Sequence, residues 1–342
     1  MSIFVNAYST VRDASPKGDE VSHRGFATAE SAEAIEEIQQ HLYDFAGYVD
    51  QLGMARFGTM TAQTFDTIDH INHTLNQYVF ERPDTYSPTD LTEFTDWSQS
   101  SNSIFFIQGY DSVYNAHGID LLNENGPAVP RHPSAAIRAR EIRASLAEDG
   151  LTIADTLPPV RAAEEIFSQT PEDVRNRIAS LAVLSKAAGT LIQGEPMPFE
   201  ALAREFAGYE LSFEEQESEF VEAYEAARYD DIQDEATQYQ WSIIAADTLA
   251  WCLEASPGEP TDLESVNPQE IYETVRTIPE EAQLRDPDEI CDLHEWIRCL
   301  RWHHISHGSL DEIAASICLE RHRALAWITD PFSSYEDVDL NT

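Results

Sequence analysis

Residues 241–253 constrain the fold of this chain more than any other segment, because they are apolar on every side of a helix except at Asp247. A helix without a polar face is stable only when its surroundings are apolar all round, in the core of a large domain or in a membrane. This stretch is too short to span a bilayer, and Asp247 interrupts it. It therefore predicts a central helix that other helices enclose.

The first part of the chain, by contrast, has the pattern expected of a strand, two helices and a second strand. Residues 3–8 and 103–108 have the β-branched and aromatic composition of strands. Between them we expect a helix from about Thr28 and a second one over residues 62–80, each with a single apolar stripe at helical spacing. The stripes are Ile35, Ile38, Leu42, Phe45, Val49 and Leu52 in the first helix, and Phe65, Ile68, Ile71, Leu75 and Val79 in the second. This order predicts a small α+β domain.

The polar segment 123–134 holds three prolines and a glycine, which favours a domain boundary there. We place an α+β domain at residues 1–125, a linker at 126–134 and an all-helical domain at 135–342, which makes the fold class mainly α. Three helix starts carry capping signals: Ser212 with Glu215, Ser309 with Glu312, and Asp286 followed by Pro287. Gly308 is expected to end the helix that contains the histidine-rich segment.

The charge of the chain is strongly negative, with 62 acidic against 21 basic residues. Residues 1–130 carry a net charge of −14 and residues 131–342 one of −27, so the acid is spread almost evenly. An even coat favours adaptation to concentrated salt, where the Debye length falls to about 3 Å and self-repulsion is screened. The same coat disfavours nucleic-acid binding, which needs a basic stripe. An acidic mimic of a binding partner remains the alternative.

The four cysteines show neither a C-x-x-C motif nor a paired framework, which is typical of buried residues in a reducing compartment. With no charged-then-apolar leader at the start, we expect a soluble cytoplasmic protein that does not contact the membrane.

Several segments of the last sixty residues resemble a known family. They are L-R-D-P-D-E-I-C-D-L from Leu284, the pair Arg301 and Trp302, E-R-H-R-A-L-A-W-I from Glu320, and D-V-D-L-N-T from Asp337. These segments are similar to the C-terminal part of a bacterial and archaeal family known as domain of unknown function 4272, and the resemblance extends from about residue 134. It implies a helical fold and carries no established activity, so it transfers no catalytic residues.

The histidine-rich end of the helix over residues 288–307 raises the possibility of a metal site, because His and Cys one turn apart share an ion in some proteins. Its candidates are Cys299, His303 and His307. Residues eight apart on a helix are about 12 Å apart, so Cys299 and His307 cannot bind the same ion. Core or helix-end histidines are the ordinary interpretation of this segment, and we expect no cofactor.

Arg321 is the sharper signal, because it falls in the middle of an apolar helical stripe where a guanidinium has to be paired. Asp247 is the partner that the sequence suggests, and we expect the two side chains to meet across the core of the second domain. A buried ion pair that fixes helix register is the ordinary interpretation. A functional pocket is the alternative, with Glu320, His322 and Arg323 at its rim.

No nucleophile motif, glycine-rich phosphate loop, H-E-x-x-H motif or dinucleotide fingerprint occurs in the sequence. The leading interpretation is therefore a non-enzymatic binding or regulatory protein with an unknown protein partner. The competing one is a hydrolase, metal-dependent in one version, that uses the histidine-rich helix end or the Arg321 region. A concave pocket with converging polar groups would favour the enzyme, and a flat apolar patch the binding protein.

Overall fold

The computed structural model describes residues 2–256, 258, 260–263, 266–330 and 333–341. The chain forms two compact units. The N-terminal unit contains the described residues up to Ala136 together with Glu164–Ile166, and the C-terminal unit contains Ile137–Ala163 and the described residues from Phe167 onward.

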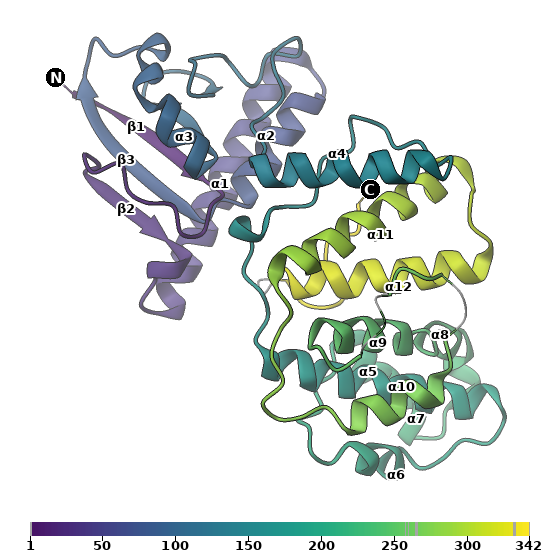
Figure 1. The fold of residues 1–342 in the computed structure, drawn as a ribbon. Coiled ribbons are helices and arrows are strands. Elements are labelled where there is room, and N and C mark those ends of the chain that lie inside the picture. The colour runs from purple at the N-terminus through teal and green to yellow at the C-terminus, as the bar shows by residue number, and fades with distance from the viewer. Residues whose placement is uncertain (1, 257, 259, 264–265, 331–332, 342) are drawn as a thin grey trace. The chain divides into compact units, whose positions relative to one another are not determined.

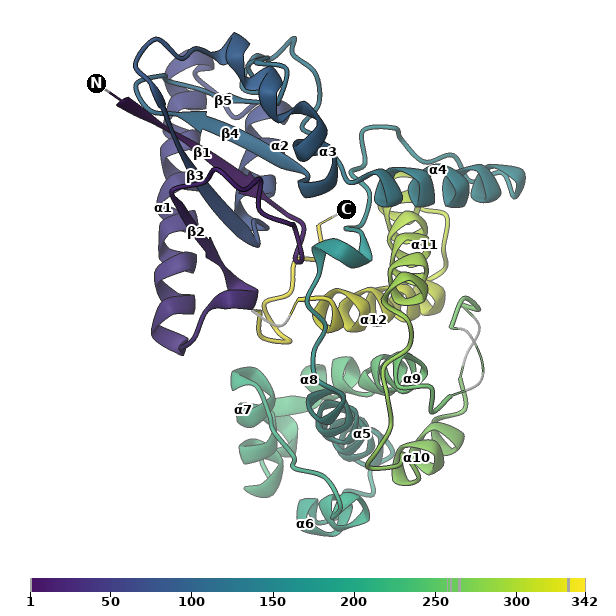
Figure 2. The ribbon, with the colours of Figure 1, turned by 60° about the vertical axis from the view of Figure 1, so that its left-hand side comes forward.

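The N-terminal unit is built on an antiparallel sheet in the order β2-β3-β1-β4-β5 (Figures 1 and 2). The central strand β1 pairs with β3 on one side and with β4 on the other. The strands are β1 (Ser2–Ser9), β2 (Ser22–Gly25), β3 (Asn76–Pro83), β4 (Ser103–Ile107) and β5 (Val113–Tyr114). The helical elements of this unit are η1 (Phe26–Thr28), α1 (Ala32–Phe57), α2 (Ala62–Asn72), η2 (Pro88–Phe94) and α3 (Thr95–Ser101).

Side chains alternate across this sheet and fill one apolar cluster on each face. Tyr8 and Ile104 pack with residues of α1 and α2, whereas Val5, Ala7 and Phe105 pack with residues of η2 and α3. The predicted stripe of the first helix is confirmed, because Leu42, Phe45 and Val49 of α1 are all buried; these three and Ile71 of α2 belong to the first cluster. The fold is the α+β arrangement that the sequence predicted for this part of the chain.

One predicted element is wrong. The second helix was expected over residues 62–80, but α2 ends at Asn72 and residues 76–83 form β3. Phe65, which we expected on the buried stripe, has 54% of its surface exposed. Tyr78 and Phe80 are fully buried on one face of the sheet, and hydrogen bonding to β1 outweighs the helical spacing of their neighbours.

All regular secondary structure in the described residues of the C-terminal unit is helical (Figure 1). Its α-helices are α4 (Pro133–Glu148, which begins in the first unit), α5 (Pro171–Ile192), α6 (Phe199–Ala203), α7 (Glu215–Glu225), α8 (Gln233–Tyr239), α9 (Ser242–Cys252), α10 (Pro268–Arg276), α11 (Pro287–His307) and α12 (Glu312–Ile328). Its short 3-10 turns are η4 (Arg204–Phe206) and η5 (Tyr229–Ile232), whereas η3 (Ala163–Glu165) begins in this unit and its residues Glu164 and Glu165 belong to the N-terminal unit.

Helix α9 is the central helix that the sequence predicted. It packs against α5, α10 and α12, and apart from Asp247 all of its residues are buried. The apolar core of the unit is continuous around it and includes residues from α5, α11 and α12. None of the helices in the described ranges is both long enough and apolar enough to cross a bilayer.

Of the three capping residues that the sequence predicted, one is found in the structure and two are not. Asp286 caps α11 through the backbone N–H of Asp288, and Gly308 ends that helix with a left-handed φ of 66°. Glu214 rather than Ser212 caps α7, and Asp311 rather than Ser309 caps α12. Each of these two helices therefore begins later than its serine suggests. At α12 the carboxylate of Asp311 accepts from the backbone N–H of Ala314, and at α7 the free N–H groups of Gln216 and Glu217 donate to the carboxylate of Glu336.

Candidate functional site

Helix α11 brings a stripe of basic and imidazole side chains to one face. His294, Arg298 and Arg301 follow at intervals of four and three residues, so they lie one above another along the helix. Ile305 continues the stripe and has 60% of its surface exposed. The stripe therefore changes from buried and polar to exposed and apolar as the helix approaches Gly308.

Helix α12 packs beside α11 (Figure 1) and supplies the opposite wall. Its residues Ala315, Cys318, Leu319 and His322 share one face by their spacing. The two helices enclose an open groove of about 380 Å³. The residues that line the groove are Arg301, His304, Ile305, Leu310, Glu312, Ala315, Ser316, Cys318 and Leu319. The groove is therefore mainly apolar, with its polar groups at a few positions.

Arg301 is fixed by two hydrogen bonds that use the same nitrogen. Its Nη1 donates to Nδ1 of His322, at 3.0 Å, and to the carbonyl oxygen of Leu340. Its Nε and Nη2 have no partner among the described residues, and neither is a fully buried atom. Burial lowers the pKa of Arg301, but a guanidinium remains charged throughout the physiological range. Arg301 thus presents two nitrogens, Nε and Nη2, whose N–H groups are free to bind a ligand.

Behind Arg301 lie two buried imidazoles, His294 and His322. Their ring centroids are 5.3 Å apart, and both side chains are buried. Burial, together with Arg298 and Arg138, lowers the pKa of His294 to about 3. The pKa of His322 also lies well below its usual value because of burial and the nearby His294, Arg301 and Arg298. Both rings are therefore neutral at physiological pH.

The expected direct pair of Arg321 and Asp247 is not formed. Arg321 is buried and donates from Nη1 to the carbonyl oxygen of Asp262, and no ion pair joins it to Asp247 among the described residues. The charges still influence each other, because Arg321 opposes the rise that burial causes in the pKa of Asp247. Asp247 is not fully buried, and a backbone carbonyl serves as the partner of the guanidinium.

The three residues proposed as a rim beside Arg321 point to different neighbours. Arg323 donates to Oε1 of the buried Glu320 at 3.0 Å, and burial raises the pKa of Glu320. His322 faces Arg301 of α11 instead. Successive residues of a helix are about 100° apart, so Glu320, Arg321 and His322 cannot share one face. None of Arg321, Glu320 and Arg323 lines the groove.

Near Glu320 lies a buried ion pair that the sequence did not reveal. Arg177 of α5 donates to both carboxylate oxygens of Glu217 of α7, and both side chains are at least 94% buried. The ring of Tyr335 covers the guanidinium, with its centroid 3.9 Å from Cζ. This cluster joins α5, α7 and the segment after α12.

The metal candidates do not converge. Cys299 is buried, and its Sγ lies 3.6 Å from Oε1 of Glu295. His303 and His307 stack on each other at the end of α11, with centroids 4.5 Å apart, and Nδ1 of His303 contacts Oγ of Ser309. Within the described residues, no group of three or more His, Cys, Asp or Glu side chains is placed to hold a metal ion.

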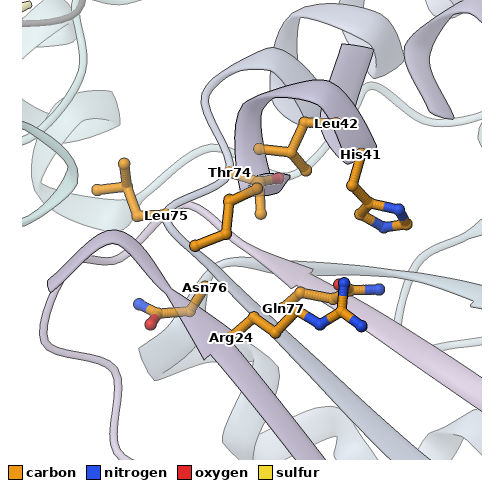
Figure 3. A pocket seen from close by; sticks show the side chains of 8 residues that line it. Arg24, His41, Leu42, Thr74, Leu75, Asn76 and Gln77 are labelled. Carbon is orange, nitrogen blue, oxygen red and sulfur yellow. The ribbon is translucent and has the colours of Figure 1, made fainter. Parts of the chain in front are cut away.

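A second hollow lies in the N-terminal unit, where Arg24 of β2, His41 of α1 and Gln77 of β3 face the same space (Figure 3). Its volume is about 10 Å³, which is room for about one water molecule. His41 is already in contact with the hydroxyl of Tyr8, at 3.4 Å. This hollow is too small to hold an organic ligand.

The groove residue that matters most, Arg301, was noted in the sequence only as part of a family resemblance. The signal that could have found it is the spacing of His294, Arg298 and Arg301, three polar residues on one stripe of a helix that also carries Ile290, Leu293 and Ile297. The pairing of that stripe with His322 depends on how α12 lies against α11 and is not visible in either segment alone.

A family model described as "Domain of unknown function (DUF4272)" matches residues 138–338, which include both walls of the groove. No curated protein and no solved structure matches the chain.

Proposed function

Because this chain belongs to the family of domain of unknown function 4272, whose description names no activity, we propose from the geometry that its C-terminal unit binds a small amphipathic acid in the groove between α11 and α12. The ligand is a monocarboxylate with an apolar chain. The observation that carries the proposal is Arg301, a guanidinium with two unpartnered nitrogens at an otherwise mainly apolar groove.

A guanidinium suits this role because its planar N–H groups match the two oxygens of a carboxylate. His322 and the carbonyl oxygen of Leu340 hold Nη1 in place, so little side-chain freedom is lost when Nε and Nη2 bind a ligand. Glu312 also lines the groove, and its negative charge disfavours a second acidic group on the ligand. These two charges together favour a monoanion.

The walls suit an apolar chain. Ile305, Leu310, Ala315 and Leu319 line the groove, and each methylene that they cover contributes about 0.8 kcal/mol. A volume of about 380 Å³ lies near the lower end of the range of about 300–1,000 Å³ that is usual for small-molecule sites. The proposal is therefore a small ligand of medium chain length.

The polar groups of the groove support binding more than catalysis. Burial raises the pKa of Cys318 to about 12, so its thiol stays protonated. Oγ of Ser316 donates to the backbone carbonyl of Glu312, and Nδ1 of His304 accepts from the backbone N–H of Leu310. No serine or cysteine among the groove residues is hydrogen-bonded to a base, which a nucleophile needs. The hydrolase interpretation gains no support from this site.

The test is a calorimetric titration in molar potassium chloride, with decanoate as the probe and decanol as its uncharged counterpart. We expect saturable binding of decanoate, with decanol weaker. Arg301→Gln removes a charge-assisted contact of about 1.5–3 kcal/mol, so decanoate should bind roughly 10- to 100-fold more weakly while decanol changes little. Arg204→Gln, at an exposed arginine outside the groove, is the matched control.

A second variant separates a lost ligand contact from a general structural effect. Ala315→Trp fills the groove without removing any of its charges and should abolish binding of both probes. The proposal fails if wild-type protein shows no saturable binding of decanoate, or if Arg301→Gln binds it as tightly as wild type does.

The setting of this binding protein is part of the same proposal. The even acidic coat, with a formal net charge of −41, supports a cytoplasm rich in salt as its place of work. In that setting a ligand with one carboxylate has to compete with high concentrations of inorganic anions. A recessed arginine beside apolar walls suits this competition, because the chain of the ligand adds binding free energy that small ions lack.

A further inference from the structure

The last turns of α11 carry two imidazoles that lie against each other. His303 and His307 are four residues apart, so their side chains share one face of the helix. The ring centroids are 4.5 Å apart, and the planes of the rings differ by 23°. Neither side chain is buried. The structure therefore places two solvent-accessible rings side by side.

Hydrogen bonds orient both rings through the same nitrogen, Nδ1. Nδ1 of His307 lies 3.2 Å from the carbonyl oxygen of His303. A carbonyl only accepts, so this nitrogen carries the proton and the lone pair of the ring is on Nε2. Nδ1 of His303 lies 2.9 Å from Oγ of Ser309, and a hydroxyl oxygen is able to accept from it in the same way. Neither Nε2 atom has a hydrogen-bond partner among the described residues, so both are available to a ligand.

The end of α11 produces this arrangement. Gly308 ends the helix with a left-handed φ of 66°, and the chain then brings Oγ of Ser309 to His303. Metal-binding histidines are held in this manner, because a partner on the second ring nitrogen fixes both the tautomer and the orientation of the ring. The neighbouring His304 is used differently, since its Nδ1 accepts from the backbone N–H of Leu310.

We propose that His303 and His307 bind one divalent transition-metal ion through their Nε2 atoms, with water completing its coordination. Imidazole suits Cu²⁺, Ni²⁺ and Zn²⁺. Two metal–nitrogen bonds of about 2.1 Å span at most about 4.2 Å between the nitrogens, so rings with centroids 4.5 Å apart need only small rotations to share an ion. Cys299 is buried and takes no part.

The open coordination positions follow from the number of protein ligands. Within the described ranges, no third His, Cys, Asp or Glu side chain joins the pair in a metal-binding group. A tetrahedral ion therefore keeps two positions for water, which the exposure of both rings allows. Neither histidine lines the groove between α11 and α12, so this site is separate from the proposed ligand site.

The first experiment is a fluorescence titration with Cu²⁺, which binds nitrogen ligands most tightly in the divalent series. The ring of Trp302 lies 5.8 Å from that of His307, so bound copper should quench its emission. We expect saturable quenching with one ion per chain. His303→Ala and His307→Ala should each weaken binding at least about tenfold, because the second imidazole binds intramolecularly. His117→Ala, at an exposed histidine of the N-terminal unit, should bind like wild type.

Far-UV circular dichroism of each variant separates a lost ligand from a lost fold. The proposal is overturned if wild type shows no saturable quenching, or if either His303→Ala or His307→Ala binds copper as tightly as wild type does, since the two rings then do not share an ion.

The second experiment requires no variant. Crystals soaked in Cu²⁺ should give an anomalous peak at bonding distance from both Nε2 atoms, and a saturating soak without that peak would overturn the proposal. Arg301→Gln should bind copper like wild type. The decanoate titration of wild type decides the groove independently, so failure of one proposal leaves the other intact.

Discussion

Acidification should destabilise this protein through His294 before most of its carboxylates titrate. The pKa of His294 is lowered from 6.5 to about 3 in the folded state, chiefly by burial and then by Arg298 and Arg138. At pH values between these two pKa values, His294 binds a proton in the unfolded chain but not in the folded one. The free energy of unfolding therefore falls as the pH falls. The contribution of His294 is fully present above pH 6.5 and is lost progressively below it.

The magnitude follows from the size of the shift. One pH unit within this window is worth about 1.36 kcal/mol per group, so acidification from pH 6.5 to pH 5 removes roughly 2 kcal/mol through His294 alone. His322 adds a loss of the same sign, because its pKa is also well below the usual value. Glu320 acts in the opposite direction, because burial raises its pKa, so its contribution to stability is present at low pH and is lost as the pH rises through that raised value.

The assay is urea unfolding at several pH values between about 7 and 5, in chloride-free potassium glutamate at molar concentration. Wild type should lose stability across this range, and His294→Phe should lose measurably less. His117→Gln, at an exposed histidine of the N-terminal unit, should follow wild type. Equal slopes for wild type and His294→Phe would refute the reasoning.

Two further predictions concern the stability of the whole chain. Glu217→Gln leaves the buried guanidinium of Arg177 without its charge partner, so urea unfolding should show a loss of about 3–5 kcal/mol, whereas the double variant with Arg177→Met should recover most of it; a single variant as stable as wild type would contradict the buried pair. Dialysis from molar to millimolar salt should unfold the protein through self-repulsion of the acidic coat, and an unchanged far-UV circular dichroism spectrum would count against salt adaptation.

The sequence predicted the helices that have a single possible environment. Residues 241–253 have no polar face to expose, so a buried central helix was the only soluble solution, and α9 has that position. The stripe of α1 was equally decisive, because one row of apolar residues defines one buried face. The segment over residues 62–80 was ambiguous. Its apolar spacing fits a helix, but Tyr78 and Phe80 also fit a strand, and pairing with β1 decided between them.

The candidate site was less accessible to sequence reasoning, because its parts come from several elements. The sequence placed Arg321 in the apolar core and suggested Asp247 as its partner. No rule of spacing shows that the guanidinium donates instead to the backbone carbonyl of Asp262. The same holds for Arg301 and His322, which are 21 residues apart in the chain. Capping differed because other carboxylates take the free N–H groups: Asp311 at the start of α12, and Glu336, more than a hundred residues away in the chain, at the start of α7.

What the sequence determined by itself is the set of surfaces that have to be buried, the acidic character of the remainder and membership of one family, because each depends only on composition and local spacing. Which charge meets which partner was decided by the tertiary structure alone. A buried guanidinium donates to whichever oxygen or ring nitrogen the packed helices bring to it, and that choice depends on the packing of elements far apart in the sequence.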